Sequence, residues 1–165
     1  MKIKKGLKKT AALVLILTTA CLTLLAGCSQ PGTGAETSPE NFRTACEDDN
    51  LTVTMDADPS ELGLEGVKTY CKGEHSTENI LTQYISFSDD KAAADAFETF
   101  KKSIDPGAEG SMYVITEKTY TAAVATRDSR YTKAIQAGNL IISVAGPSMY
   151  KSALNRILLK FGYNS

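Results

Sequence analysis

Residues 131–145 read YTKAIQAGNLIISVA and contain the hairpin signal around which the predicted fold is arranged. Two strand-like runs, 131–136 and 140–145, meet at Gly138-Asn139, a pair of residues suited to a tight turn. The sequence therefore predicts two antiparallel strands joined at this turn.

Further elements are predicted on both sides of the hairpin. One helix begins after the cap Ser38-Pro39-Glu40, the clearest helix begins after Ser88-Asp89-Asp90, and a last helix begins at Ser148. The clearest helix has an apolar stripe at helical spacing, formed by Ala93, Ala96, Phe97, Phe100 and Ile104. The other strand-like runs are 51–55, 67–72, 80–87, 112–116 and 118–126, with a polar turn at 73–77.

These elements follow the order α-βββ-α-ββββ-α over residues 39–165, which we expect to form a single domain. Few connections are long enough for a parallel crossover, so the sheet is predicted to be mainly antiparallel. The helices are expected to pack on one face of that sheet. The predicted class is therefore α+β.

The N-terminal segment has the three parts of an export signal. Residues 1–10 are cationic, residues 11–24 are mainly apolar, and Leu25-Ala26-Gly27-Cys28 follows. These four residues resemble the bacterial lipobox, in which the chain is cut before the cysteine and the thiol is linked to diacylglycerol. This resemblance implies cleavage between Gly27 and Cys28 and a lipid anchor on Cys28.

An uncleaved transmembrane helix is the alternative interpretation of the same segment. The run 11–26 has 16 residues and includes three threonines, whereas a helix needs about 20 apolar residues to span a bilayer. The run is therefore short for a span, and Cys28 lies at its far end, where lipidation would place it. Cys21 lies within the segment that is removed.

The net charge of −1 is the sum of two opposite parts. Residues 1–27 contain five lysines and no acid, and residues 28–165 contain thirteen Lys and Arg against nineteen Asp and Glu. The mature chain is therefore acidic, which disfavours nucleic-acid binding. Residues 28–38 are rich in Gly, Ser, Thr and Pro and are predicted to be a flexible tether.

Two cysteines, Cys46 and Cys71, remain in the predicted domain. An even pair in an exported protein favours a disulfide, which would stabilise the fold by about 3 kcal/mol. Two buried free thiols are the alternative. A zinc site formed with His75 is disfavoured, because only Cys71 and His75 have the close spacing of zinc ligands. We therefore expect no metal and no cofactor.

Catalytic motifs are not evident in the sequence. A hydroxyl nucleophile needs a nearby base and a group that orients this base, and His75 is the only histidine. Two carboxylate pairs, Asp56 with Asp58 and Asp89 with Asp90, allow a small hydrolase. Each pair also lies where a helix N-terminus favours an acid, so the structural interpretation is preferred.

One stretch of the acidic domain is locally basic and aromatic. It contains Lys118, Tyr120, Arg127, Arg130, Tyr131 and Lys133. Such a stretch is suited to contacts with anionic lipid head groups, a wall polymer or a partner protein. A solvated strand face is the alternative interpretation.

The mature chain resembles small uncharacterised lipoproteins of Gram-positive bacteria. The shared features are a Phe-containing first helix, a strand like 51–54, the strand QYISF at 83–87, a hairpin like 137–142 and a last helix ending in FGY at 161–163. Asp49-Asn50-Leu51 departs from the Asn-Gly-Tyr that this family often has. The resemblance implies a location and a fold, and it supplies no catalytic residues.

Together these observations predict a lipid-anchored lipoprotein on the extracytoplasmic face of the cell membrane. Its domain is expected to be a non-enzymatic binding or interaction domain that contacts an envelope protein or a wall polymer. A small envelope hydrolase with a carboxylate pair is the alternative. A transporter's solute-binding protein is a third option, but it normally needs two lobes around a cleft.

Overall fold

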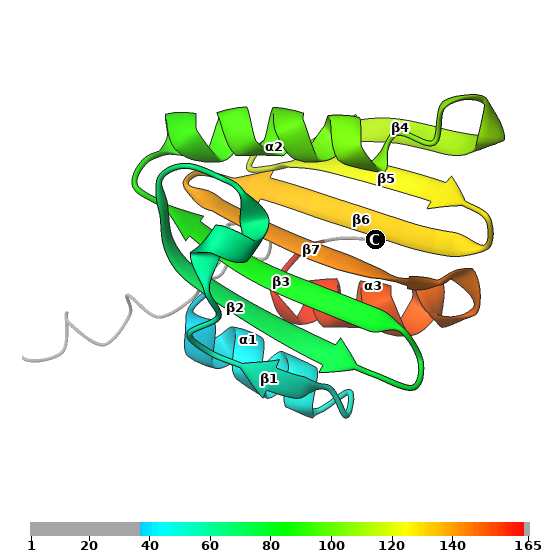
Figure 1. Cartoon of the computed structure of the whole chain (residues 1–165), viewed down its shortest axis with the longest axis horizontal. Coiled ribbons are helices and arrows are strands. Elements are labelled where there is room, and N and C mark those ends of the chain that lie inside the picture. The colour runs from blue at the N-terminus through cyan, green and yellow to red at the C-terminus, as the bar shows by residue number, and fades with distance from the viewer. Residues whose placement is uncertain (1–36, 164–165) are drawn as a thin grey trace, which may run out of the picture. The chain divides into compact units, whose positions relative to one another are not determined.

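The computed structural model describes residues 37–163, which form an α+β domain with one antiparallel sheet (Figure 1). The predicted lipobox, Cys21 and most of the predicted tether lie outside the described residues. The helices are α1 (Pro39–Glu47), α2 (Asp90–Ile104) and α3 (Lys151–Lys160), with 3-10 helices η1 (Pro59–Leu62), η2 (Gly107–Glu109) and η3 (Ser148–Tyr150). The strands are β1 (Thr52–Thr54), β2 (Val67–His75), β3 (Ile80–Phe87), β4 (Gly110–Thr116), β5 (Thr121–Arg127), β6 (Arg130–Ala137) and β7 (Leu140–Pro147).

The seven strands are hydrogen-bonded in the order β1-β2-β3-β7-β6-β5-β4, and every neighbouring pair is antiparallel. The chain forms one meander from β1 to β3, crosses over through α2, and forms a second meander that returns from β4 to β7. The predicted class, the antiparallel sheet and the element order are confirmed. The predicted hairpin is β6 and β7, which are paired from Arg130 with Pro147 to Ala137 with Leu140.

The helices cover both faces of the sheet, so the prediction of a single covered face is wrong. Phe42 of α1 and Leu154 of α3 belong to the same apolar cluster as Ile142 of β7. Phe97 of α2 belongs to a second cluster, with Ile141 of β7. Because Ile141 and Ile142 are neighbours in one strand, they point to opposite faces. We call these faces the α2 face and the α1/α3 face.

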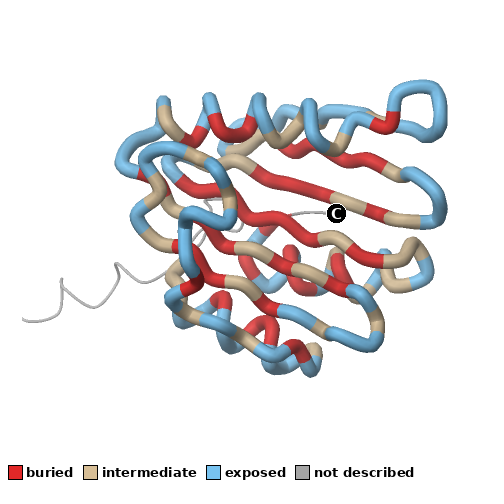
Figure 2. Tube along the Cα trace, in the orientation of Figure 1, coloured by how far each residue is buried: buried red, intermediate tan, exposed pale blue. Residues whose placement is uncertain are grey.

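The middle of the sheet is buried on both sides, as the red segments of β6 and β7 in Figure 2 show. Residues 140–144 of β7 are all buried, and such a continuous apolar run is typical of a strand covered on both faces. The alternation of side chains therefore requires a helix layer on each side. This requirement places α2 opposite α1 and α3.

The predicted caps set the N-terminal ends of α1 and α2, whereas the last helix, predicted to begin at Ser148, begins at Lys151 after η3 and has no side-chain cap among the described residues. The hydroxyl of Ser38 accepts a hydrogen bond from the Asn41 amide at 3.1 Å, and the carboxylate of Asp89 accepts one from the Ala92 amide at 2.8 Å. Such side-chain caps satisfy amides that have no partner within the helix.

No helix within residues 37–163 combines the length and the apolar character needed to cross a membrane.

The hairpin of β2 and β3 turns at a later position than predicted. Residues 73–75 continue β2 instead of forming a turn, and Gly73 is paired with Thr82 in β3. The turn lies at residues 76–79, where Asn79 adopts a φ of 52°. Asparagine tolerates this left-handed backbone region better than most residues, which allows the turn to close there.

Gly73 marks the point where α1 lies closest to the sheet. A Cβ at this residue would lie 2.6 Å from the Thr82 hydroxyl and 3.0 Å from the Cys46 sulfur. Both distances are shorter than normal contacts, so a side chain here would push α1 away from β2.

We therefore expect Gly73→Ala to lower the free energy of unfolding by about 2 kcal/mol, as overpacking of a core does. Glu74→Ala is the control, because Glu74 is exposed on the opposite face of the same strand. Urea unfolding of the two variants measures the difference. An equal and small effect of both variants would contradict the close packing of α1 on Gly73.

Candidate functional site

The basic and aromatic residues predicted as one surface are divided among three places. Lys118 and Tyr120 lie in the connection between β4 and β5, where the Tyr120 ring meets the Tyr163 ring edge-on at 5.3 Å. Arg127 and Arg130 lie at the other end of β5, about 20 Å away along the strand. The predicted stretch therefore does not form one continuous surface.

Tyr131 and Lys133 are buried, so their placement on an interaction surface is wrong. Their exposed fractions are 2% and 1%, because this side of β6 faces the α1/α3 layer. The Tyr131 hydroxyl donates to the Asn155 side-chain oxygen at 2.9 Å, and the ammonium of Lys151 lies 5.3 Å from the centre of the Tyr131 ring. Burial raises the pKa of Tyr131 to about 12 and lowers the pKa of Lys133.

The two remaining basic residues, Arg127 and Arg130, line a groove of about 610 Å³ at one end of the sheet. The groove lies where the β5–β6 turn, the end of α2 and the turn before β3 come together. Ile104 of α2, Ala125 of β5 and Pro147 of β7 provide apolar surface within it. The same groove contains residues from four separate segments of the chain.

The β5–β6 turn holds the two arginines opposite each other. Arg127 is paired with Arg130 in the strand register, and the turn between them is Asp128-Ser129. Both turn residues have positive φ values, 46° and 64°, which are typical of a tight hairpin turn. Like charges in directly opposite positions destabilise a sheet unless another charge compensates them.

Of the two arginines, only Arg127 is paired with carboxylates of the described residues. Arg127 forms ion pairs with Glu109 at 2.5 Å and with Asp128 at 3.3 Å. Arg130 is half-buried, donates one long bond of 3.4 Å to the Asn79 carbonyl, and forms no ion pair with any residue of 37–163. The guanidinium of Arg130 therefore retains donors for an anionic group in the groove.

The two cysteines are free buried thiols, so the predicted disulfide is not formed in this structure. The thiols have separate partners: the Cys46 sulfur lies 3.2 Å from the Thr82 hydroxyl, and the Cys71 thiol donates to the Met55 carbonyl at 2.7 Å. Burial raises the pKa of both thiols, and that of Cys46 to about 11. Both are therefore protonated and unreactive near neutral pH.

The alternative zinc ligands are not brought together. His75 lies at the end of β2, where its Nδ1 is 3.2 Å from the Thr77 hydroxyl. Within the described part of the chain, no group of three or more His, Cys, Asp or Glu side chains has the geometry to hold a metal ion.

One carboxylate of each pair considered for a hydrolase caps a helix, Asp58 at η1 and Asp89 at α2. Asp58 accepts a hydrogen bond from the Ser60 amide at 2.9 Å, and Asp89 caps α2. These backbone hydrogen bonds lower the pKa of each carboxyl below its ordinary value. Both groups are thus stabilised as exposed carboxylates, whereas a general acid needs a raised pKa.

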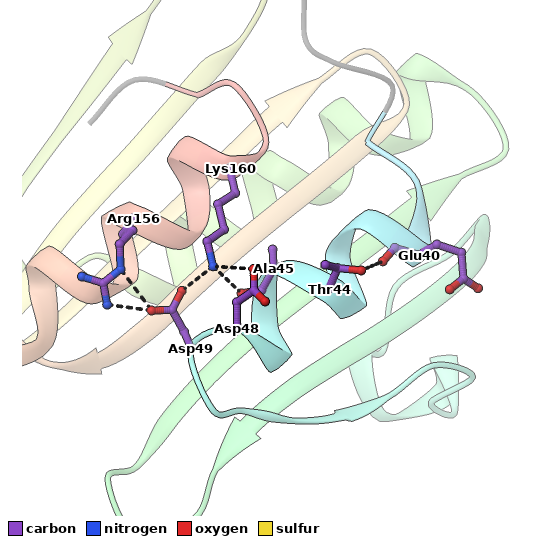
Figure 3. A network of polar contacts seen from close by, with 7 residues as sticks. All are labelled: Glu40, Thr44, Ala45, Asp48, Asp49, Arg156 and Lys160. Atoms are coloured by element: carbon purple, nitrogen blue, oxygen red, sulfur yellow. Dashed lines mark hydrogen bonds and ion pairs between the residues drawn. The ribbon is translucent and has the colours of Figure 1, made fainter.

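A network of charges joins the end of α1 to α3 (Figure 3). Arg156 donates two hydrogen bonds to one oxygen of Asp49, at 2.6 and 3.1 Å, and Lys160 donates to the other oxygen at 2.9 Å. Lys160 also donates to the Ala45 carbonyl at 3.2 Å, which caps the end of α1, and contacts Asp48 at 3.3 Å. This network is a structural clamp between two helices, and the sequence did not indicate it.

Asp49 is the centre of this clamp, with a side chain only 9% exposed. Burial raises its pKa, but the hydrogen bonds and charges of Arg156 and Lys160 outweigh burial, so the pKa lies below its ordinary value. The carboxylate therefore stabilises the fold fully above the unfolded pKa of about 3.9. This stabilisation is lost as the pH falls through the lower folded-state pKa.

We expect Asp49→Asn to lower the free energy of unfolding at neutral pH by about 1 kcal/mol, a value reduced by the exposure of the partners. Asp48→Asn is the control, since Asp48 is exposed and contacts Lys160 alone. The effect of Asp49→Asn should disappear in acid, below the folded-state pKa. A pH-independent loss, or an equal loss in Asp48→Asn, would contradict the role assigned to the Asp49 charge.

The state of the thiols is tested by alkylation with mass detection of the peptides that contain Cys46 and Cys71. The native protein should resist iodoacetamide at neutral pH, because both thiols are buried and protonated. In denaturant without reductant, both residues should be alkylated. Alkylation that requires a reductant would show that the disulfide forms after all.

Comparison with known proteins adds no functional assignment. No model of a protein family matches the chain, and no curated protein is significantly similar to it. The residues of the groove and of the N-terminal segment are therefore the observations from which a function can be inferred.

Proposed function

We propose that the chain is a lipoprotein anchored on the extracytoplasmic face of the cell membrane, with a non-enzymatic binding or interaction domain. The observation that carries this proposal is the position of Leu25-Ala26-Gly27-Cys28, directly after a cationic and an apolar segment. Two acyl chains on Cys28 provide stable attachment, which a single chain does not. The resemblance to small lipoproteins of Gram-positive bacteria agrees with this location.

The start of the fold supports a short tether. Helix α1 begins at Pro39, with its cap at Ser38, so only residues 28–37 separate the lipidated cysteine from the domain. A flexible segment of this length has a reach of about 17 Å. The domain would therefore act close to the membrane surface.

The groove beside Arg130 supports a binding role for the domain. It combines apolar surface with a guanidinium that forms no ion pair within residues 37–163. Asp105 and Asp128 also line the groove, and Arg127 is already paired with Asp128 and Glu109. A carboxylate or phosphate group of an envelope component would therefore compensate the charge of Arg130 alone. Binding of this kind needs positioned donors and no reactive residue.

The hydrolase alternative has less support, because it depends on the two carboxylate pairs. A carboxylate mechanism needs a second acid whose environment raises its pKa. Asp58 and Asp89 are instead exposed caps with lowered pKa values. A solute-binding protein is also less suited to the domain, which is built on a single sheet.

The anchor is tested by incorporation of a labelled fatty acid into the full chain in a bacterium that processes lipoproteins. The wild-type protein and the control Cys21→Ser should both be labelled, and Cys28→Ser should not, because only Cys28 follows the Leu-Ala-Gly residues.

The binding role is tested in the same cells by chemical crosslinking in the membrane. One envelope component should be recovered repeatedly with the wild type and lost in Arg130→Glu.

Arg43→Glu is the matched control for the charge reversal, since Arg43 is an exposed arginine of α1 outside the groove. It should leave the crosslinked component unchanged. Labelling of Cys28→Ser would contradict the anchor. Equal crosslinking of wild type and Arg130→Glu would contradict binding at the groove.

A further inference from the structure

The two edges of the sheet differ in length and protection. The edge strand β1 has three residues, and the edge strand β4 has seven (Figure 1). Natural edges are protected by short strands, charged residues, proline or bulges, because an open edge offers backbone groups to another strand. The β1 edge is protected because the strand is short. The longer β4 edge lacks this protection.

The strand β4 itself has no charged residue, no proline and no bulge. Its sequence, GSMYVIT, contains no charge and no proline. All seven residues are paired with β5 in a continuous register, from Gly110 with Arg127 to Thr116 with Thr121, so no bulge turns the edge away. The strand is therefore regular along its whole length.

Two large apolar side chains are exposed on this edge. Tyr113 is 51% exposed and Val114 is 48% exposed, and both rank among the few large exposed apolar residues of the described domain. As neighbours in a strand, they point to opposite faces of the sheet. An added strand would thus cover apolar surface on both faces at once.

The backbone of β4 also has capacity for another strand. An antiparallel edge strand directs half of its N–H and C=O groups away from its partner. No hydrogen bond joins residues 110–116 to any described residue other than those of β5. The outward groups are therefore open to solvent or to a second strand.

We propose that β4 pairs in an antiparallel arrangement with β4 of a second copy of this chain, which extends the sheet across a dimer. A register centred on Tyr113 pairs all seven residues, with Tyr113 opposite its symmetry mate and Val114 opposite Met112 of the second copy. Identical antiparallel strands are self-complementary about a two-fold axis, as in most homodimers. Aromatic and apolar cross-strand pairs stabilise such a ladder.

The position of the N-terminus favours a second copy as the occupant. The two-fold axis of this pairing is perpendicular to the sheet, so the α1/α3 faces of both copies lie on the same side. Helix α1 begins the described chain on that face, so both tethers leave from the same side and can reach one membrane. The argument that both tethers reach one membrane depends on the proposed lipid anchor. The anchor would also raise the local concentration of the two copies.

Sedimentation velocity of the full chain in mild detergent, over a range of concentrations, tests the pairing. The wild type should form a concentration-dependent dimer, and Val114→Lys should raise its dissociation constant about tenfold or more, because an edge lysine opposes strand addition. Leu159→Lys is the matched control, since Leu159 on α3 has the same exposed fraction of 48%. It should leave the dimer unchanged.

Three outcomes would overturn the proposal: a wild type that is monomeric at every concentration, an equal loss in Leu159→Lys, or a β4 that captures a different protein instead of a second copy. If circular dichroism shows that Val114→Lys is unfolded, Thr116→Lys on the same edge replaces it. Cys28→Ser separates this proposal from the anchor, because it removes the lipid and should retain the β4-dependent dimer in solution.

Discussion

Burial of β7 on both faces is the constraint on which the rest of the structure depends. Ile141 packs toward α2, and Ile142 and Val144 pack toward α1 and α3. Because a strand in the middle of a sheet presents side chains to both sides, each side needs its own helix layer. The crossover through α2 supplies the second layer and also places the β4 meander on the far side of β7. The open edge at β4 is thus a consequence of the same topology.

Much of the fold was predictable because its signals are local. The positions of Ser38 and Asp89 before apolar helical stripes predict that they are caps, and both accept the expected amide hydrogen bonds. The prediction that all helices pack on one face of the sheet is wrong, because α2 lies on the opposite face from α1 and α3. The run of apolar residues at 140–145 has no alternation, which indicates a strand buried on both sides, and its consequence for helix placement had to be read from the sheet order.

The candidate site was only partly predictable. Arg127 and Arg130 stand out in the sequence as part of a locally basic and aromatic stretch, and the turn between them places both in a groove. Asn79 and Pro147 come from distant segments that only the strand register brings to the same end of the sheet. Lys133 is buried although a charged residue in a strand is expected to face solvent, because its neighbours on that face are apolar.

The proposed protein has a membrane anchor and two proposed binding surfaces, the groove beside Arg130 and the free edge of β4. The free edge offers the most direct physical test. Hydrogen exchange of backbone amides in the full-length protein can be compared in dilute and concentrated samples. The account predicts slower exchange in Gly110–Thr116 at high concentration, with no change in Thr52–Thr54 of the opposite edge. Exchange in Gly110–Thr116 that is independent of concentration would contradict it.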